Sequence, residues 1–234
     1  AYGCDNTKNF KNTKFQDLLQ IILEKTTIPR IRISSIGIEY INKELLKIFK
    51  NTRINPHFHL SIQSGSDKIL KSMNRNYSRE ILLEVLKNLN NLKRDDKILV
   101  SIGADIIVGF PGEDESDFMK SFELIKKFNI TKVHGFKFSP HKNHYTVPAG
   151  NFPNQVSESL KTQRLKKLLK EAEKIRTNFI EQNKGKNLNI LIEKIKGKSF
   201  NGWSENYISL NETNFEPLSG EKIKVGKIAN GKFL

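Results

Sequence analysis

A stripe of polar side chains on an expected strand, residues 55–64, is the feature of this sequence most able to bind a ligand. Side chains alternate between the two faces of a strand. Four polar residues therefore share one face, opposite the apolar residues: His57, His59, Ser61 and Gln63. A buried polar group without a partner costs several kcal/mol. The stripe thus indicates a hydrated or ligand-filled concavity, and the alternative is a sheet with one exposed face.

Neighbouring expected strands carry polar side chains in the same way. Asp105 lies inside the most apolar strand, residues 98–110, and this position favours the ligand-filled concavity. Ligand sites of parallel sheets lie at the carboxyl ends of the strands, so we expect the site there. The other polar residues assigned to such a face are Arg30, Arg32, Ser34, Lys137 and Ser139.

Two strand ends carry turn residues that suit a ligand site. After the second strand, in residues 63–67, Ser64 or Ser66 can cap a helix and Gly65 lets a ligand approach the backbone. After the third strand, the segment VGFPGED (108–114) combines two glycines that leave room, an aromatic ring and a proline that fixes the bend. One such segment is often only a turn. Two at equivalent ends of neighbouring strands favour a binding site.

His57 and His59 raise a second possibility, a metal site. Two histidines at i and i+2 on a strand can bind one metal ion, with Asp105 or His134 completing the set. This would be typical of a metal-dependent hydrolase built on a barrel. We favour two hydrogen-bonded interior histidines, because no further Asp or His lies at a convincing strand end. No metal ligand and no catalytic residue is therefore predicted.

Strand and helix patterns alternate over the first 140 residues. This alternation predicts an α/β fold with a parallel sheet and right-handed crossovers. Four strands are too few to close a parallel barrel, so an open sheet or part of a barrel is expected. The expected helices are 14–25, 41–51, 78–93 and 115–129, and the expected strands are 28–36, 55–64, 98–110 and 131–139.

The pattern changes after residue 140. A polar loop leads to a long basic helix, residues 157–185, which Gly185 ends. Short strands separated by Gly and Asn turns follow, and they predict a small antiparallel β-barrel. The predicted divisions are a partial barrel (1–150), a basic linker helix (151–185) and the small barrel (186–234).

Composition narrows the class of protein. Of the 234 residues, 37% are hydrophobic, which is enough for a core. No apolar run is long enough for a membrane span, and no secretory signal opens the chain, so a cytoplasmic location is expected. The single cysteine, Cys4, excludes an internal disulfide and a cluster held by this chain alone. The net charge of +15 favours a polyanionic partner, nucleic acid first, and the alternative is a lysine-rich surface without such a partner.

Four segments, in this order and spacing, are similar to one family. They read RIRISSI, HFHLSIQSGSDKILKSMNRNYS, ADIIVGFPGEDESDF and FKFSP. Together they resemble the radical S-adenosylmethionine methylthiotransferases over about residues 1–150. Residues 193–210 are similar to TRAM, the OB-like RNA-binding barrel that ends these enzymes. The resemblance implies a partial radical-SAM (βα) barrel followed by a TRAM domain.

The resemblance also implies a function, tRNA methylthiolation at C2 of threonylcarbamoyladenosine next to the anticodon. S-adenosylmethionine would be cleaved at one [4Fe–4S] cluster and a second cluster would supply sulfur, from a donor that the sequence does not identify. Other branches of the family act on isopentenyl-adenosine in tRNA or on a ribosomal protein. A metal-dependent barrel hydrolase and a bare RNA-binding module are the alternatives from other classes.

The sequence departs from the family pattern in several places. The cluster cysteines are absent, so the ligands of both clusters are expected outside this chain. Residues 1–3 resemble the end of the family's second barrel strand, and we expect a C-terminal fragment that is inactive by itself. Ser61 replaces a proline, and His141 replaces an arginine in a longer loop, which leaves the substrate contacts of this loop unassigned.

Matching positions supply the expected cofactor contacts. Polar contacts to S-adenosylmethionine are assigned to Gln63 and Ser64, packing around its adenine to Gly109, Phe110 and Pro111, and two further contacts, from the polar stripe, to Ser34 and Asp105.

The expected RNA contacts lie in the terminal barrel. Stacking on bases is assigned to Trp203 and Tyr207, with barrel core as the alternative. Contacts to phosphates are assigned to Lys194, Lys196 and Lys198. The basic helix 157–185 is either a tRNA-facing surface or a solvated face.

Overall fold

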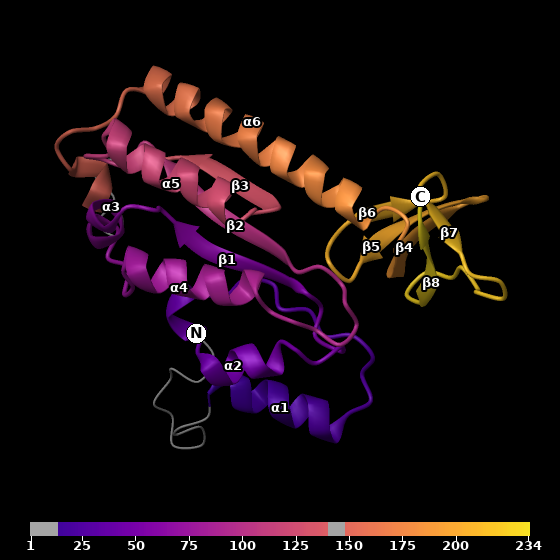
Figure 1. The fold of residues 1–234 in the computed structure, drawn as a ribbon. Helices are drawn as coiled ribbons and strands as arrows, with labels where there is room; N and C mark the ends of the chain where they lie inside the picture. Colours follow the sequence, from indigo (N-terminus) through magenta and orange to yellow (C-terminus); the bar gives the residue numbers. More distant parts are fainter. Residues whose placement is uncertain (1–13, 140–147) are drawn as a thin grey trace.

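The computed structural model describes residues 14–139 and 148–234, which form two units joined by a long helix (Figure 1). The first unit contains a three-stranded parallel sheet and the second a five-stranded antiparallel sheet. The predicted fold class, an α/β unit followed by a small antiparallel barrel-like unit, is confirmed. None of the described helices has the length and apolarity needed to cross a bilayer.

The parallel sheet has the strand order β1-β2-β3, so strands consecutive in sequence are neighbours. Its carboxyl ends lie at one edge because every pairing is parallel. The strands are β1 (His57–Gln63), β2 (Ser101–Val108) and β3 (Lys132–Lys137), and the helices of this unit are α1 (Phe15–Lys25), α2 (Lys43–Ile48), α3 (Asp67–Ser72), α4 (Arg79–Asn90) and α5 (Glu115–Lys127), with short 3-10 helices η1 (Ile38–Tyr40) and η2 (Pro148–Asn151).

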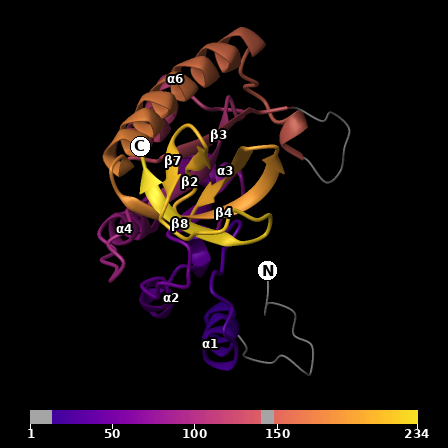
Figure 2. The ribbon, with the colours of Figure 1, turned by 90° about the vertical axis from the view of Figure 1, so that its right-hand side faces the viewer.

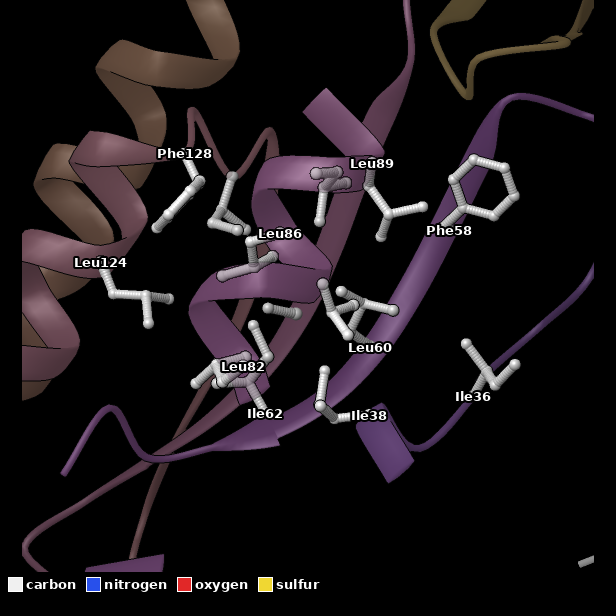
Figure 3. Close-up of a cluster of buried hydrophobic side chains, with 14 of the residues drawn as sticks. Ile36, Ile38, Phe58, Leu60, Ile62, Leu82, Leu86, Leu89, Leu124 and Phe128 are labelled. Atoms are coloured by element: carbon white, nitrogen blue, oxygen red, sulfur yellow. The ribbon is translucent and has the colours of Figure 1, made fainter. Parts of the chain in front are cut away.

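The core of the first unit lies between the sheet and helices α4 and α5 (Figure 3). Phe58, Leu60 and Ile62 of β1 are all fully buried, as their alternation with polar residues predicts. Leu82, Leu86 and Leu89 of α4 face them at helical spacing. Burial of each such side chain contributes about 1.5–3 kcal/mol. This packing fixes the face of β1 that is left for polar residues.

The expected strand 28–36 is not a regular strand. Two isolated bridges join this segment to the chain around β1, Ile31 to Ile54 and Ile36 to Leu60. The Ile36 N–H donates to the His59 carbonyl at 2.9 Å, but the segment does not continue this ladder towards its start. The prediction of a complete fourth strand is therefore wrong, because the segment diverges from β1 between the two bridges.

The long helix α6 (Glu158–Asn183) belongs to both cores. Its residues Leu168, Ala172 and Ile175 pack in the first core, and Phe179 packs in the second. Figures 1 and 2 show the helix running along the first unit to the second sheet. The predicted divisions at residues 150 and 185 remain predictions, but this helix is integral to the packing on both sides.

The second unit is a curled antiparallel sheet (Figure 2). Its strand order is β6-β5-β4-β8-β7. Gly202 allows a close approach to the neighbouring strand, because a Cβ there would lie 2.0 Å from the carbonyl oxygen of Leu191. The strands are β4 (Asn187–Lys196), β5 (Ser199–Ser204), β6 (Ser209–Asn211), β7 (Phe215–Pro217) and β8 (Ile228–Phe233).

Candidate functional site

The open face of the parallel sheet, the face turned away from α4 and α5, carries a polar cluster with one side chain from each strand. The Nε2 atom of His59 lies 2.9 Å from Asp105 Oδ1, and Nδ1 of His134 lies 3.4 Å from the same oxygen. The two imidazole rings are 4.9 Å apart. The polar stripe expected on β1 therefore meets polar side chains of β2 and β3.

His57 lies at the amino end of β1 and does not join this cluster. Its Nδ1 atom is 3.1 Å from Ser101 Oγ, and its ring stacks on Tyr207 at 4.5 Å. Burial, with a smaller contribution from Arg32, lowers the pKa of His57 to about 3, so the ring is neutral near pH 7. The pairing of His57 with His59 around one ion is thus not what the structure shows.

The assignment of Lys137 to the open face is wrong. Lys137 forms an ion pair with Glu158 of α6, so its side chain lies on the helix-covered side. The register pairs Asp105 with His134, and paired residues of parallel strands point to the same face. Even-numbered residues of β3 therefore share a face with odd-numbered residues of β2, and sequence alternation within one strand does not reveal this offset.

The turn after β1 begins with backbone strain. Gln63 has φ of +62°, in the left-handed region that a residue with a side chain rarely adopts. The Tyr77 hydroxyl supports this conformation by donating to the carbonyl of Ile62 at 2.7 Å and to that of Ser61 at 3.0 Å. Strain of this kind concentrates at ligand sites. The half-buried amide of Gln63 lies at the carboxyl edge of the sheet, where the cofactor contact is expected.

The rest of this turn is tied to α5. The Ser64 hydroxyl is fully buried and accepts from the Ser66 N–H at 3.2 Å, and the Gly65 N–H donates to Ser121 Oγ at 2.8 Å. A Cβ on Gly65 would lie 2.7 Å from the carbonyl oxygen of Lys120. The idea that Gly65 makes room for a ligand is therefore wrong, because α5 occupies that space. Direct cofactor contact by Ser64 stays a prediction.

The expected helix-capping role of the two serines is not seen. Ser66 is the first residue before α3, but its hydroxyl donates to Asp117 at 2.6 Å instead of capping the helix. The serine pair thus connects the β1 turn to the start of α5.

The loop after β2 is held by its own glutamate and by α6. The Gly109 N–H and an Arg164 N–H both donate to Oε1 of Glu113, at 2.8 and 2.7 Å. A Cβ on Gly109 would lie 2.3 Å from Cγ of Lys161. A glycine at this position therefore lets α6 pack closely against the loop. Open space remains at Gly112, where a Cβ would meet no heavy atom within 4 Å.

The aromatic ring of this loop is packed inside the protein. Phe110 is 5% exposed and contacts Phe138 and Phe152 edge-on, with ring centroids 5.0 and 6.4 Å apart. Pro111 is buried beside it. Both side chains belong to the packed interior beside the carboxyl edge, and their packing on an adenine stays a prediction.

Glu113 and Arg164 form a buried ion pair. Burial raises the pKa of Glu113, against the opposing effects of the Gly109 N–H and Arg164. Among the described residues, Oε2 of Glu113 and Nε of Arg164 have no hydrogen-bond partner. The pair therefore fixes the loop at a desolvation cost that its mutual contact and the Gly109 N–H offset.

Four residues that hold the two turns or the chain beside them were not predicted. Tyr77 and Arg79 bond the first turn, Arg164 bonds the second, and Lys161 donates to the carbonyl of Phe138 just after β3. The sequence of α6 contains a pattern from which Lys161 and Arg164 could have been predicted. Lys161 and Arg164 stand at helical spacing from the apolar positions 168, 172 and 175. Cations that continue a buried apolar stripe indicate buried partners, and both side chains are only 3% exposed.

The two expected cofactors differ in their fit to these residues. The carboxyl edge carries the half-buried amide of Gln63, the open space at Gly112 and the buried apolar cluster around Phe110, and groups of these kinds are compatible with a nucleoside with a polar tail such as S-adenosylmethionine. The described residues include no cysteine, so they do not fit an iron–sulfur cluster. Two other predicted contacts are Ser34, which is exposed beside β1, and Asp105, which lies in the His–Asp–His cluster.

The expected phosphate-binding lysines, Lys194, Lys196 and Lys198, are all exposed on the β4–β5 hairpin. Trp203 donates from Nε1 to Glu193 and stacks on Tyr207 with ring centroids 4.3 Å apart. These positions leave the lysines free to contact a polyanion. RNA stacking by the two aromatic rings stays a prediction.

Tyr207 lies at the junction of the two units. Besides Trp203 and His57, its ring contacts the Arg32 guanidinium, which lies 3.8 Å from the ring centroid. Protein groups thus already stack on this ring. The junction also contains a hydrogen bond from Arg30 Nη2 to the Asn189 carbonyl, at 2.7 Å.

Comparisons with known proteins agree with the motifs at these strand ends. A sequence model of the Radical SAM superfamily matches residues 9–125. The chain belongs to the radical SAM superfamily. This confirms the family expected from the four sequence segments, and the matched range includes β1, β2 and both turns of the candidate site.

Several curated proteins are similar to this radical SAM chain. It is 38% identical over 194 residues to a threonylcarbamoyladenosine tRNA methylthiotransferase of Thermotoga maritima, covering 82% of this chain and 43% of that protein. For the Aquifex aeolicus protein of the same name, identity is 36% over 225 residues, covering 96% and 51%. A tRNA-2-methylthio-N(6)-dimethylallyladenosine synthase of a Thermoanaerobacter species is 33% identical over 233 residues, covering 99% and 47%. The chain spans about half the length of the curated relatives it matches.

Proposed function

We propose that this chain is part of a tRNA methylthiotransferase that acts at C2 of threonylcarbamoyladenosine next to the anticodon. The observation that carries the proposal is its similarity, at 38% and 36% identity, to two proteins named for that substrate. The dimethylallyladenosine enzyme is similar at 33% and supports the second candidate substrate. Membership of the radical SAM superfamily argues against a metal-dependent hydrolase and a bare RNA-binding module.

Within this activity, the described residues would bind and orient. S-adenosylmethionine, when bound, supplies the radical chemistry and the methyl group. Gln63 would offer hydrogen bonds to its polar part, and the apolar cluster around Phe110 would lie beside its adenine. No step is assigned to an iron–sulfur cluster, since the described residues lack its ligands.

Nucleoside analysis tests the substrate. The complete gene would be expressed in a bacterial strain that lacks tRNA methylthiotransferases, and its digested tRNA would be examined by mass spectrometry. We expect 2-methylthio-threonylcarbamoyladenosine. Appearance of the methylthio-isopentenyl product alone would identify the second candidate, and the absence of both products would refute a tRNA methylthiotransferase.

The exposed lysines of the β4–β5 hairpin are expected to bind tRNA. The triple change of Lys194, Lys196 and Lys198 to glutamate should weaken tRNA binding about tenfold or more near physiological salt. The slope of log affinity against log salt should fall by about 2–3, since each lost phosphate contact lowers it by about 0.7–0.9. Filter binding of the whole chain to tRNA, repeated over a salt series, measures both values.

A matched control distinguishes an effect of these three lysine positions from an effect of net charge. Lys43, Lys47 and Lys50 are exposed lysines in and just after α2, and changing them to glutamate alters the net charge equally. We expect a much smaller loss of affinity in this control. Equal losses in the two triple variants would show that tRNA responds only to the overall charge of +15.

A further inference from the structure

The His–Asp–His cluster on the open face consists of His59, Asp105 and His134, and the proposed function assigns no role to its two histidines. We infer that these three side chains form a binding site for one divalent transition-metal ion, with zinc as the preferred ion. The inference depends only on described residues and is independent of the proposed function.

The donor atoms already stand close to the arrangement that such an ion requires. The ligand atoms of the three residues all lie within 4.8 Å of one another. Asp105 Oδ1 is 2.9 Å from His59 Nε2 and 3.4 Å from His134 Nδ1. With bonds of about 2.0–2.1 Å, neighbouring ligands of tetrahedral zinc are about 3.3–3.4 Å apart. Small side-chain rotations would therefore admit the ion.

Three paired strands hold the ligands. Asp105 and His134 are register partners on β2 and β3, and His59 pairs with Gly103 on the neighbouring strand. A Cβ at position 103 would lie 2.7 Å from His59 Nδ1, so the glycine gives the imidazole its place over the sheet. Sites on strands are positioned more exactly than sites on loops. Cofactor binding gives no reason for a glycine inside the most apolar strand. The space that the His59 imidazole needs does give one.

The donor set and its exposure define the chemistry. Two imidazole nitrogens and one carboxylate oxygen suit zinc and other first-row divalent ions. The side chains are 10%, 24% and 45% exposed for His59, Asp105 and His134, so the cluster opens to one side. Three protein ligands leave at least one position for water or for an oxygen atom of a bound molecule. The site is thus of the open kind, not the closed structural kind.

Metal titration of the chelator-treated whole chain tests the inference. We expect uptake of one zinc ion per chain by calorimetry and by elemental analysis. Asp105→Asn and His134→Ala should each weaken binding about 100-fold. Cobalt in place of zinc should give visible absorption bands that both variants lose.

Two controls test whether the variants fold and whether other histidines bind the zinc. His134 is the most exposed ligand, so its truncation is not expected to disturb folding, which circular dichroism checks. A His141→Ala and His144→Ala double variant removes the two other histidines outside β1 and should bind zinc as the unchanged chain does. Absence of stoichiometric uptake would overturn the inference. Retained affinity in D105N and H134A would also overturn it, leaving a hydrogen-bonded His–Asp–His network without an ion.

Discussion

Replacing Arg164 with methionine is expected to lower the free energy of unfolding by about 3–5 kcal/mol, because it leaves the Glu113 carboxylate buried without its charge partner. The pair is joined at 2.7 Å, and both side chains are almost fully buried. The lost stability should be larger at pH 7.5 than at pH 5. Burial raises the pKa of Glu113 and Arg164 opposes this, so loss of Arg164 raises the pKa further in the folded variant. Stability is lost as pH rises from the unfolded-state pKa through the folded-state pKa, and the variant therefore loses more stability than the unchanged chain.

Two further variants distinguish the lost pair from a damaged helix. Lys170→Met changes an exposed lysine of the same helix and should alter stability by no more than about 0.5 kcal/mol. The double change Glu113→Gln with Arg164→Met removes both charges while an amide oxygen can still accept from the Gly109 N–H. It should recover much of the loss seen in urea unfolding. A double variant no more stable than R164M would contradict the assigned role of the pair.

The elements of the fold were predictable where local signals agreed. The helices over 15–25, 79–90, 115–127 and 158–183 and the strands over 57–63, 101–108 and 132–137 all lie within the expected ranges. Amphipathic periodicity and apolar runs determine such elements locally. The prediction of a strand over 28–36 was wrong. The residues alternate as in a strand, but the segment pairs with the chain around β1 only at two isolated bridges.

The candidate site was predictable in part. Alternation within β1 and β2 correctly indicated that His59 and Asp105 share an open face. It could not align β3 with β2, so Lys137 was placed on the wrong side and His134 entered only as an alternative ligand. The glycines at 65 and 109 mark close approaches by α5 and α6, which no local pattern distinguishes from an approach by a ligand.

The junction between the units illustrates the same limit. Trp203 and Tyr207 read as base-stacking residues because aromatic rings in a small basic barrel often are. Base stacking stays a prediction, but Tyr207 also contacts Arg32 and His57, which precede it by more than a hundred residues. Contacts between distant segments depend on how whole units dock. They cannot be predicted from the sequence of either unit alone.

Replacing Tyr207 with alanine is therefore expected to loosen the second unit from the first. The ring stacks on Trp203 and His57 and lies under Arg32, and together these contacts are expected to stabilise the junction by about 2–4 kcal/mol. We expect thermal unfolding to change from one transition to two, because the two cores would no longer unfold together. Calorimetry of the whole chain, with hydrogen exchange at β1 and β5, measures this separation.

Tyr207→Phe is the matched control, since it keeps the ring and loses only the hydroxyl. It should retain the single transition, and residual binding of tRNA through the hairpin lysines should persist in both variants. If Y207A unfolds in one transition at unchanged stability yet loses tRNA affinity at every salt concentration, the ring stacks on RNA and not on the junction. The stack of His57, Tyr207 and Trp203 would then be a resting arrangement that RNA displaces, and the polar residues at the amino end of β1 would be free to face the tRNA.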